Sequence, residues 1–276
     1  MATKAKGVSK QIAYKKETTF GVAPGATGAK LLRRTSADFN STRESYSSEE
    51  IRISQQTNDF RLGTKSTDGS LNGELSPNTY ADFIQSILAR DFTAGGTAAS
   101  VSVTIALSAG FNTLTRATGS FLTDNFKVGE VVRMTGAGLN VANVSNNLLV
   151  VSVSALVLTV RVLSDTPLVA EGPIATVAIA SIGKETFVPA SGHTDDSYSI
   201  SEFYQDIALS ELHSGCKVGS FSVNTPASGL VTTDFTFMGK GLDQTGTTSY
   251  FTTPTALGTT GIVAAANGAV IVNGLA

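Results

Sequence analysis

The strongest constraint on this fold is a long polar segment that leads directly into a short amphipathic pattern. Residues 49–90 read EEIRISQQTNDFRLGTKSTDGSLNGELSP and then NTYADFIQSILAR. Ile51 and Ile53 alternate with polar residues near the start of the polar segment, and Leu71 and Leu75 do so near its end. Because side chains alternate between the two faces of a strand, both ends are predicted to be half-buried strands.

The middle of this segment, residues 55–70, has too little apolar surface to order itself. Its bulky apolar residues are Phe60 and Leu62 alone, and Gly63 and Asp68-Gly69 are turn signals. Since buried apolar surface must offset the loss of chain entropy, the segment needs a partner surface. It is either an exposed mobile loop or a docking arm that a neighbouring subunit buries, with ion pairs setting the register. The arm residues concerned are Arg52, Gln55, Asp59, Arg61, Lys65 and Asp68.

A helix is predicted directly after the polar segment. Ser76 suits the N-cap, Pro77 suits the first helical position, and the pattern continues to Arg90. At roughly fourteen residues such a helix is marginal alone, so its apolar stripe must pack on a sheet. The stripe consists of Tyr80, Phe83, Ile84, Ile87 and Leu88.

The composition of the chain favours strands over helices. Hydrophobic residues make up 41 % of the 276 residues and charged residues 15 %, with 27 Gly and no Trp. Together with many Ser and Thr, this indicates short strands and tight turns. The predicted fold class is all-β, mainly β with one short helix.

The chain is predicted to contain two domains. After Phe92 the sequence TAGGTAAS resembles a linker, and residues 93–182 are poor in charge and rich in Val, Thr, Ala and Gly. We expect residues 93–182 to form a small β domain inserted into a discontinuous domain of residues 1–92 and 183–276, because insertions are tolerated where chain ends lie close together at a surface.

The longest apolar stretch, Leu148 to Leu163, is predicted to be a β-hairpin. Leu158, Val160 and Val162 share one face of its second strand. Polar residues interrupt the stretch, and it is shorter than the ~20 residues that a membrane helix needs. No membrane insertion is expected from this chain.

Several further strands are expected in the outer parts of the chain. Residues 1–35 are predicted to be an arm with one strand around Gln11 to Tyr14 and a flexible GVAPGATGAK segment. In the predicted strand from Tyr198 to Ile207 the alternation of apolar and polar residues is interrupted between Ile200 and Phe203, which indicates a bulge. The predicted strand from Cys216 to Asn224 has a similar interruption near Gly219. Residues 231–237 alternate cleanly, and AVIVNGLA is predicted as a last strand.

Charge is distributed unevenly along the chain. Residues 1–92 contain 13 Lys and Arg against 10 Asp and Glu, residues 93–182 contain 4 against 4, and residues 183–276 contain 3 against 8. The net charge of −2 disfavours a protein that grips nucleic acid by neutralising phosphates. The basic front and the acidic back of the chain are instead expected to meet.

The motifs that support catalysis or cofactor binding are missing or weak. The sequence contains no GxxxxGK[ST] phosphate loop, and one cysteine, Cys216, forms no internal disulfide. His213 with Cys216, and His193 with Asp195, are better explained as a turn leading into a core and as a solvated loop. We therefore expect no enzyme activity, no catalytic or metal-binding residues and no cofactor.

The order of several segments carries a family resemblance. The run ISQQTNDFRLGTKSTDGSLNGELSPNTYADFIQSIL resembles the tail tube proteins of long-tailed, siphovirus-type bacteriophages, which have a polar extended arm, a Gly-rich return strand and a short helix in this order. The segments YSISEFYQDI, HSGCKVGSFSVNTPASGLVTTDFTFMGKGL and TTPTALGTTGIVAAANGAVIVNGLA resemble later strands of the same family. Together these segments cover roughly two thirds of the chain.

The resemblance implies an architecture and a function. The expected fold is an antiparallel β-sandwich or partial barrel with the helix on its outside. Six copies form a ring, and rings stack into a tube that conducts double-stranded DNA into the host without binding it specifically. The inserted domain is expected on the outer surface, and the polar arm is expected to contact another subunit or ring.

The resemblance also implies partners and a location. The chain is expected to bind itself, a tape measure protein and tail terminator and tip proteins, and to belong to the virion tail after assembly in the host cytoplasm. A DNA conduit needs a polar or acidic lining, because Lys and Arg would hold the duplex. The candidate lumen face is Thr232, Asp234 and Thr236, with Glu202 and Asp206 as weaker candidates, unless these residues form an outer solvated face.

Two other functions remain open from the sequence. The chain could be a virion decoration or adhesion protein whose inserted β domain contacts the host surface. A carbohydrate-active enzyme is disfavoured, since the chain has no Trp for sugar stacking and no evident pair of catalytic carboxylates.

Overall fold

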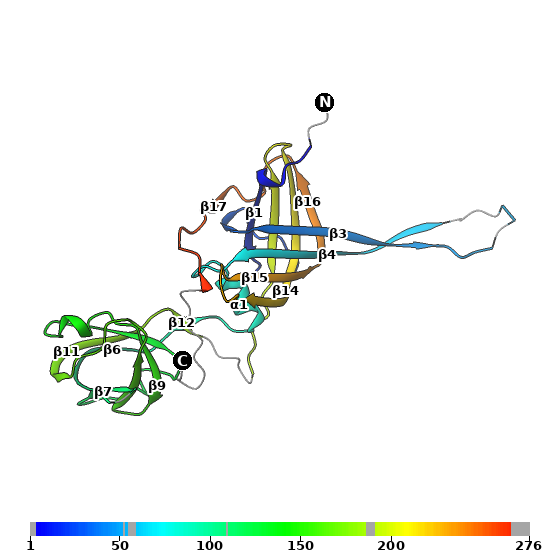
Figure 1. Cartoon of the computed structure of the whole chain (residues 1–276). Coiled ribbons are helices and arrows are strands. Elements are labelled where there is room, and N and C mark those ends of the chain that lie inside the picture. Colours follow the sequence, from blue (N-terminus) through cyan, green and yellow to red (C-terminus); the bar gives the residue numbers. More distant parts are fainter. Residues whose placement is uncertain (1–3, 52, 55–58, 109, 186–190, 266–276) are drawn as a thin grey trace. The chain divides into compact units, whose positions relative to one another are not determined.

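The structure, a computed structural model, describes residues 4–51, 53–54, 59–108, 110–185 and 191–265. The chain divides into two compact units. Within the described residues, unit 1 comprises residues 4–91 and 191–265, and unit 2 comprises residues 92–185. Strands dominate both units and α1 is the one α-helix among the described residues, so the predicted all-β class is confirmed (Figure 1).

Unit 1 contains nine strands in the order β17-β2-β1-β13-β14-β15-β4-β3, with β16 also paired to β14. All pairs are antiparallel except β17 with β2. The elements are η1 (Gly7–Ser9), β1 (Lys10–Lys16), β2 (Thr27–Leu31), β3 (Ser36–Ser47), β4 (Phe60–Glu74), β13 (Tyr198–Tyr204), β14 (Leu209–Asn224), β15 (Thr232–Gly239), β16 (Gly241–Gly246) and β17 (Thr253–Thr255).

The amino-terminal region is more ordered than the sequence indicates. The predicted strand around residues 11–14 is confirmed as part of β1. The segment expected to be flexible contributes Thr27–Leu31 as β2, which pairs with β1 and places Ala29 in the core at 0 % exposure. The predicted last strand, AVIVNGLA, lies outside the described residues.

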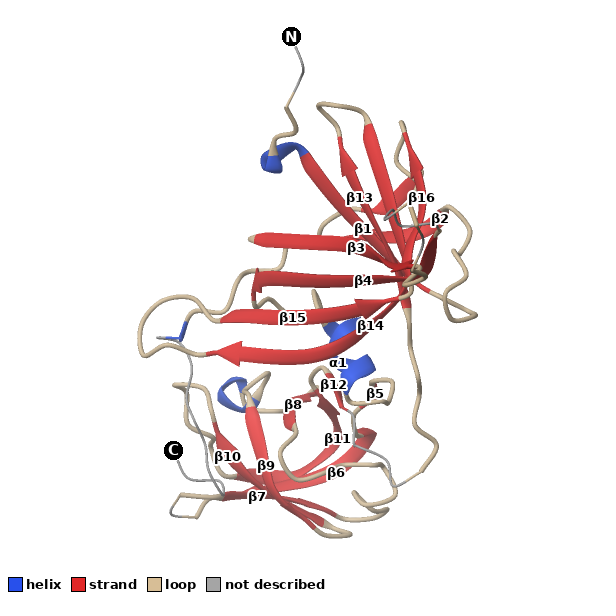
Figure 2. Ribbon diagram, turned by 90° about the vertical axis from the view of Figure 1, so that its right-hand side faces the viewer, coloured by secondary structure: helices blue, strands red, loops and turns tan. Residues whose placement is uncertain are grey.

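Strand β14 belongs to two sheets. Its first half, Leu209–Cys216, pairs with β13 and β16, whereas its second half, Lys217–Asn224, pairs with β15. The strands of the two sheets cross at a large angle (Figure 2). A strand that passes from one sheet into another must bend, and bulges or positive-φ glycines provide the bend.

Two irregularities in β14 lie at this bend. Gly215 has a φ of 67° next to a register shift against β13, and the ladder with β15 shifts between Val218 and Ser220. The predicted slip near Gly219 is therefore confirmed. The other register slip was expected between Ile200 and Phe203. It lies instead between Tyr198 and Ile200 of β13, and the extra residue that causes it belongs to β14 and not to β13.

A buried carboxylate fixes the bend. Glu17 Oε1 accepts hydrogen bonds from Gly215 N at 2.7 Å and Ser199 Oγ at 2.7 Å, and Oε2 accepts from Gly21 N at 2.8 Å and Ser197 Oγ at 2.6 Å. The side chain is 8 % exposed. Glu17 therefore joins the segment after β1, the start of β13 and the bulge of β14, and it satisfies the backbone N–H that the bulge removes from the ladder.

The core of unit 1 is aromatic and lies between the two sheets. The Phe83 ring contacts rings from both sheets, with centroid distances of 4.7 Å to Tyr14 and 5.2 Å to Tyr198 on one side, and 5.7 Å to Phe235 and 5.2 Å to Phe237 on the other. The contacts of Phe83 with Tyr198, Phe235 and Phe237 are edge-to-face, a geometry that stabilises beyond the area that it buries. Helix α1 thus covers the core by inserting one ring between the sheets.

The helix is shorter than predicted. It spans Ala81–Ile87 with Tyr80 as N-cap, so the predicted start at Ser76–Pro77 is wrong. Asn78 has a φ of 64°, a left-handed conformation that prevents helical backbone from beginning earlier, and Ala89 has a φ of 53° just beyond the other end.

The apolar stripe of the helix is arranged around its first turn. Tyr80 and Phe83 are 1 % and 0 % exposed, and Ile84 packs against the same core. Ile87 and Leu88 are half-buried. The two buried aromatic rings therefore anchor this short helix.

Polar contacts also hold the helix. Asp82 accepts a hydrogen bond from Tyr14 Oη at 3.0 Å and pairs with Lys30 at 2.6 Å, while its carbonyl accepts from Tyr198 Oη at 2.6 Å. Burial, with the Asp82 carboxylate adding to it, raises the pKa of Tyr14 far above its usual value. The Tyr14 hydroxyl therefore stays protonated and remains a donor.

The two ends of the polar segment differ. Leu71 is 0 % exposed in β4, as the alternation predicts. Ile51 and Ile53 are fully exposed, at 101 % and 103 %, and lie outside any strand, so the strand predicted there is wrong. The last residue pair between β3 and β4 is Ser47 with Phe60, and Ile51 and Ile53 lie in the connection beyond it.

Unit 2 is a closed six-stranded barrel in the order β10-β7-β6-β11-β8-β9. The predicted hairpin at residues 148–163 is confirmed as β9 and β10. The elements are β6 (Thr97–Ala106), β7 (Asn112–Arg116), β8 (Val131–Thr135), η2 (Val141–Asn143), β9 (Leu148–Val153), β10 (Val157–Val162) and β11 (Glu171–Ser181). Closure leaves no unpaired barrel edge, and the barrel has its own apolar core, including Leu114, Met134, Leu158 and Ile179 at 0 % exposure.

Two short strands lie where the chain enters and leaves the barrel. β5 (Thr93–Ala94) and β12 (Lys184–Glu185) pair antiparallel, with Ala94 opposite Lys184. The two crossings of the chain are therefore adjacent.

Removal of the Glu17 carboxylate should destabilise unit 1 strongly. Glu17→Ala leaves four buried donors without their acceptor, and we expect a loss of about 3 kcal/mol or more in the free energy of unfolding. Urea denaturation followed by circular dichroism, below the concentration at which the protein assembles, measures this loss. Glu49→Ala, at an exposed position, is the control and should change stability by less than about 0.5 kcal/mol. Equal effects of the two substitutions would contradict the role assigned to Glu17.

Candidate assembly surfaces

Strands β3 and β4 continue beyond the sandwich as a hairpin arm. We define the arm as Ser41–Ser47, Phe60–Ser66 and the described residues between them. Nearly every described residue of the arm is exposed, whereas Thr67, the next residue of β4, is 1 % exposed. Figure 1 shows β3 and β4 leaving the rest of unit 1 side by side. Within one subunit the arm is ordered by backbone pairing and by exposed side-chain hydrogen bonds, such as the one that Thr64 Oγ1 donates to Glu44 Oε2 at 3.1 Å.

The arm carries large exposed apolar side chains. Tyr46, Phe60 and Leu62 are 58 %, 57 % and 53 % exposed, and Ile51 and Ile53 are completely exposed. Exposed apolar residues grouped on one projecting element are typical of an interaction surface. The sequence pattern instead predicted that charged side chains of the arm contact another subunit and that the two isoleucines lie on the buried face of a strand.

The predicted arm residues near the tip are only partly described. Arg52 and Gln55 lie outside the described residues. Asp59 and Arg61 are exposed and pair with each other, with Arg61 Nε 2.9 Å from Asp59 Oδ2. Because this pair is local and solvated, it contributes little to stability.

The remaining predicted arm residues lie at or below the base of the arm. Lys65 Nζ donates to Leu242 O at 3.4 Å, and Leu242 N donates to Ser41 Oγ at 3.1 Å, so the arm leaves the sandwich beside the start of β16. Asp68 lies on the sandwich itself, opposite Asn40 and Met238. The four predicted arm residues that the structure describes therefore do not form one cluster.

The half of unit 1 formed by β3, β4, β15 and the second half of β14 has a polar outer face. This face lies opposite the buried Leu71, Phe235 and Phe237, and it contains four carboxylates and no lysine or arginine at its central positions. Those positions are Ser36, Asp38, Asn40, Asp68, Ser70, Asn72, Glu74, Thr232, Asp234, Thr236, Met238, Ser220, Ser222 and Asn224.

Hydrogen bonds across the strands connect many of these side chains. Ser220 Oγ lies 2.7 Å from Thr236 Oγ1, and Ser222 Oγ donates to Asp234 Oδ2 at 3.2 Å. Lys217, at the edge of this face, binds both oxygens of Asp195 at 2.6 and 2.7 Å. The face therefore presents short hydroxyl and carboxylate groups.

The structure brings together only part of the candidate lumen face. Thr232, Asp234 and Thr236 lie side by side on β15. Glu202 lies on β13 and is 1 % exposed, with Lys10 Nζ 2.6 Å from its Oε1. Asp206 lies in the β13–β14 turn and accepts from the backbone of Lys6. Glu202 and Asp206 therefore do not share a surface with the β15 residues.

Two edges of the four-stranded sheet have no strand paired to them among the described residues. One is the side of β3 that faces away from β4, and the other is the side of Lys217–Asn224 that faces away from β15. An unpaired edge presents backbone donors and acceptors to a further strand.

Charges from the front and the back of the chain pair within one subunit. Lys16 Nζ lies 2.7 Å from Asp196 Oδ2, and Lys10 pairs with Glu202. The antiparallel ladder between β1 and β13 places these residues together. Part of the opposite charge of the two ends of the chain is therefore paired within one subunit, and pairing between copies stays a prediction.

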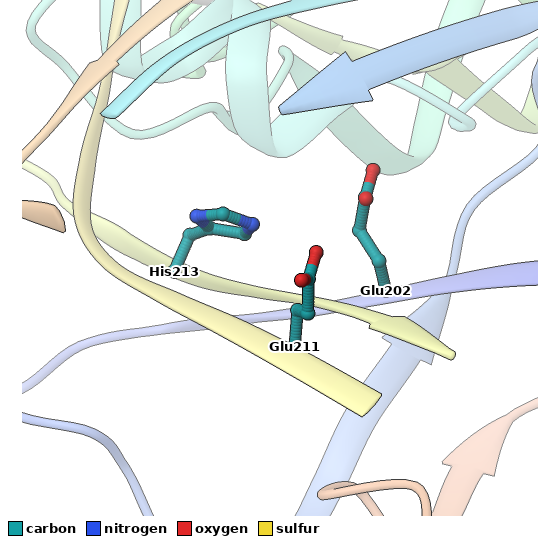
Figure 3. A group of neighbouring side chains, drawn as sticks. All are labelled: Glu202, Glu211 and His213. Carbon is teal, nitrogen blue, oxygen red and sulfur yellow. The ribbon is translucent and has the colours of Figure 1, made fainter. Parts of the chain in front are cut away.

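One group of ionisable side chains is buried near the β13–β14 turn. Glu202, Glu211 and His213 lie close together on these two strands (Figure 3). Burial, with the Lys10 ammonium adding to it, lowers the pKa of His213 to about 4, and burial raises the pKa of Glu202 while Lys10 opposes that rise. The imidazole is consequently neutral at pH 7.

The sequence pairs that could suggest catalysis do not form a nucleophile and base. Cys216 is 0 % exposed, and its Sγ donates to the His213 carbonyl, 3.8 Å away, and not to the ring. Burial, with the Glu17 carboxylate adding to it, raises the pKa of Cys216 to about 12, so the thiol is protonated at neutral pH. His193 is exposed, and its neighbour Asp195 binds Lys217.

None of the helices in the described part of the chain has the length and apolar composition of a membrane span.

Comparison with known proteins assigns the chain to a family. A family model described as "Phage tail tube protein" matches residues 7–276, nearly the whole chain. No curated protein matches this chain. The match confirms the resemblance to phage tail tube proteins that the order of the segments indicated, and it agrees with the all-β fold. The chain therefore belongs to the phage tail tube protein family and is a structural component of the virion tail.

Proposed function

We propose that this chain assembles into stacked hexameric rings that form a conduit for double-stranded DNA. The observation that carries the proposal is the four-stranded sheet of β14, β15, β4 and β3, which has one polar, acidic face and two edges that no described strand pairs with. Pairing of β3 with the second half of β14 in the next subunit satisfies both edges in every copy. A head-to-tail contact of this kind closes into a ring when the rotation between copies allows it.

A ring of six copies gives a channel that is wide enough for a DNA duplex. Six copies of four strands, spaced ~4.8 Å apart and tilted by ~40°, give a barrel with a backbone diameter of about 48 Å. Inward side chains reduce the free diameter to about 35–40 Å, which admits a hydrated duplex about 20 Å wide. Three copies give only about half this backbone diameter and exclude the duplex.

The polar face of the sheet suits the channel lining. Thr232, Asp234 and Thr236 lie at its centre. A surface of hydroxyls and carboxylates releases no counterions from DNA, so the duplex slides without being held. In this arrangement the aromatic core and α1 lie behind the lining.

The hairpin arm supplies the contacts between copies that stack the rings. Its apolar side chains are exposed in one subunit and become buried against another copy. A tape measure protein and the tail terminator and tip proteins, which follow from the family resemblance, complete the proposed assembly.

Unit 2 is proposed to be an insertion that decorates the outside of the tube. The adjacent chain crossings at β5 and β12 and the separate core of the barrel support an insertion, because neither unit needs the other to complete its sheet. A position outside the tube leaves the channel free.

Electron microscopy of the concentrated, purified chain tests the proposal. We expect long hollow tubes of stacked rings, with projections on the outer wall that correspond to unit 2. Discrete oligomers without a channel at every concentration would refute the proposal and favour a decoration or adhesion protein.

The exposed isoleucines should control polymerisation. Ile51→Ser combined with Ile53→Ser removes apolar burial worth about 3 kcal/mol or more per subunit, so the critical concentration for tube formation should rise at least about a hundredfold. Sedimentation of polymer across a concentration series measures it. Val141→Ser in unit 2, a residue that is 87 % exposed, is the matched control and should leave the critical concentration unchanged. An equal shift in both proteins would exclude the arm as the apolar contact.

Charge on the β15 face should affect the passage of DNA. Asp234→Lys adds a lysine to the proposed lining in every subunit, so DNA release from triggered particles should slow severalfold, with the delay shrinking at high salt. Asp243→Lys makes the same change at an exposed position on β16. Fluorescence of released DNA measures both variants. Release that is unchanged in Asp234→Lys, or slowed equally by both substitutions, would place the β15 face outside the channel.

A further inference from the structure

The ionisable side chains of Glu202, Glu211 and His213 at the β13–β14 hairpin are arranged in a way that suits a ligand. Glu202 lies directly opposite Glu211 in the ladder, and His213 follows Glu211 by two residues on the same face of β14. One donor atom from each residue, two carboxylate oxygens and an imidazole nitrogen, lies within 4.8 Å of the others. Figure 3 shows that the three side chains project from the same side of the two strands.

One nitrogen of the His213 ring has no hydrogen-bond partner in the described part of the chain. His213 is 1 % exposed; its Nδ1 lies 3.2 Å from Thr67 Oγ1, whereas Nε2 is buried without a partner. Nε2 is the nitrogen farther from the backbone, and Figure 3 places it on the side of the two carboxylates. A buried polar atom without a partner is unfavourable, so a ligand that accepts the Nε2 lone pair relieves that penalty.

The orientation of the ring suits a metal ligand. When Nδ1–H donates to the Thr67 hydroxyl, Nε2 of the neutral imidazole carries the free lone pair. A hydrogen bond from the second ring nitrogen is the usual way in which a protein orients a metal-binding histidine. Thr67 lies on β4, so the ring is held from the opposite sheet.

The local charge also favours a cation. The ammonium of Lys10 lies 2.6 Å from Glu202 Oε1 and 3.9 Å from the exposed Asp38. The carboxylates of Glu211 and Asp38 also act on Glu202, so the carboxyl groups near this ammonium outnumber it. Lys10 Nζ forms an ion pair with Oε1 of Glu202, and Tyr204 Oη donates a long hydrogen bond of 3.4 Å to Oε2.

We propose that Glu202, Glu211 and His213 bind a divalent transition-metal ion of the Zn²⁺ type, with water as the remaining ligand. The imidazole favours Zn²⁺ and its first-row neighbours over Mg²⁺ and Ca²⁺, which prefer oxygen ligands alone. Tetrahedral bonds of about 2.0–2.2 Å require the most distant donor atoms to approach by about 1 Å. Glu211 is half-buried at the end of a hairpin and can make this adjustment. The bound ion would link β13 to β14 and, through Thr67, to β4.

Metal titration of the full-length, chelator-treated protein tests the site. We expect one Zn²⁺ per chain by calorimetry, visible absorption bands on addition of Co²⁺, and a rise in melting temperature with Zn²⁺. Glu211→Gln removes one ligand at a half-buried position and should weaken Zn²⁺ binding at least tenfold. His213→Gln should do the same and abolish the Co²⁺ bands.

His193→Gln is the matched control, because His193 is the only other histidine and is exposed. It should bind Zn²⁺ as tightly as the unmodified chain. Absence of one-to-one binding, unchanged affinity in Glu211→Gln, or loss of binding in His193→Gln would each overturn the proposal. If circular dichroism shows that His213→Gln does not fold, the Zn²⁺ affinity of Glu211→Gln alone decides whether the site exists.

Discussion

The buried carboxylate of Glu17 holds together the strand that makes this architecture possible. β14 must serve two sheets at once, and the bulge at Gly215 that lets it turn leaves a backbone N–H without a ladder partner. Glu17 accepts that N–H together with two hydroxyls and a second backbone N–H. Without this contact the first half of β14 has no fixed direction relative to the second, and the sheet edges and polar face lose their orientation.

The bend of β14 separates two sheets that differ in how their edges and faces are covered. The sheet of β1, β13 and the first half of β14 is completed by β2, β16 and β17, and its core side receives the aromatic ring of Phe83. The sheet of β3, β4, β15 and the second half of β14 has a polar face and two edges without a partner strand in the part of the chain that the structure describes. Assembly through edges and an arm needs no pocket, which is consistent with the buried, protonated Cys216 and the membership of a structural family.

Sequence patterns predicted the elements that depend on local alternation of apolar and polar residues. They failed where residues distant in the sequence determine the structure. The alternation of residues 231–237 and the hairpin at 148–163 were predictable, because one face of each is buried. The helix start was not, since Asn78 adopts a left-handed backbone that no periodicity reveals. Ile51 and Ile53 misled the strand prediction because alternating apolar residues indicate a buried strand face, whereas both of these side chains are fully exposed. The Glu202, Glu211 and His213 group depends on the register of the β13–β14 hairpin, which the sequence does not show.

A helical reconstruction of the assembled tube by electron cryomicroscopy tests the central claim most directly. The account predicts a continuous ladder between β3 of one subunit and Lys217–Asn224 of the next, around a closed barrel whose inner surface carries Thr232, Asp234 and Thr236. A tube in which these two edges remain unpaired, or in which the β15 face points away from the channel, would contradict it.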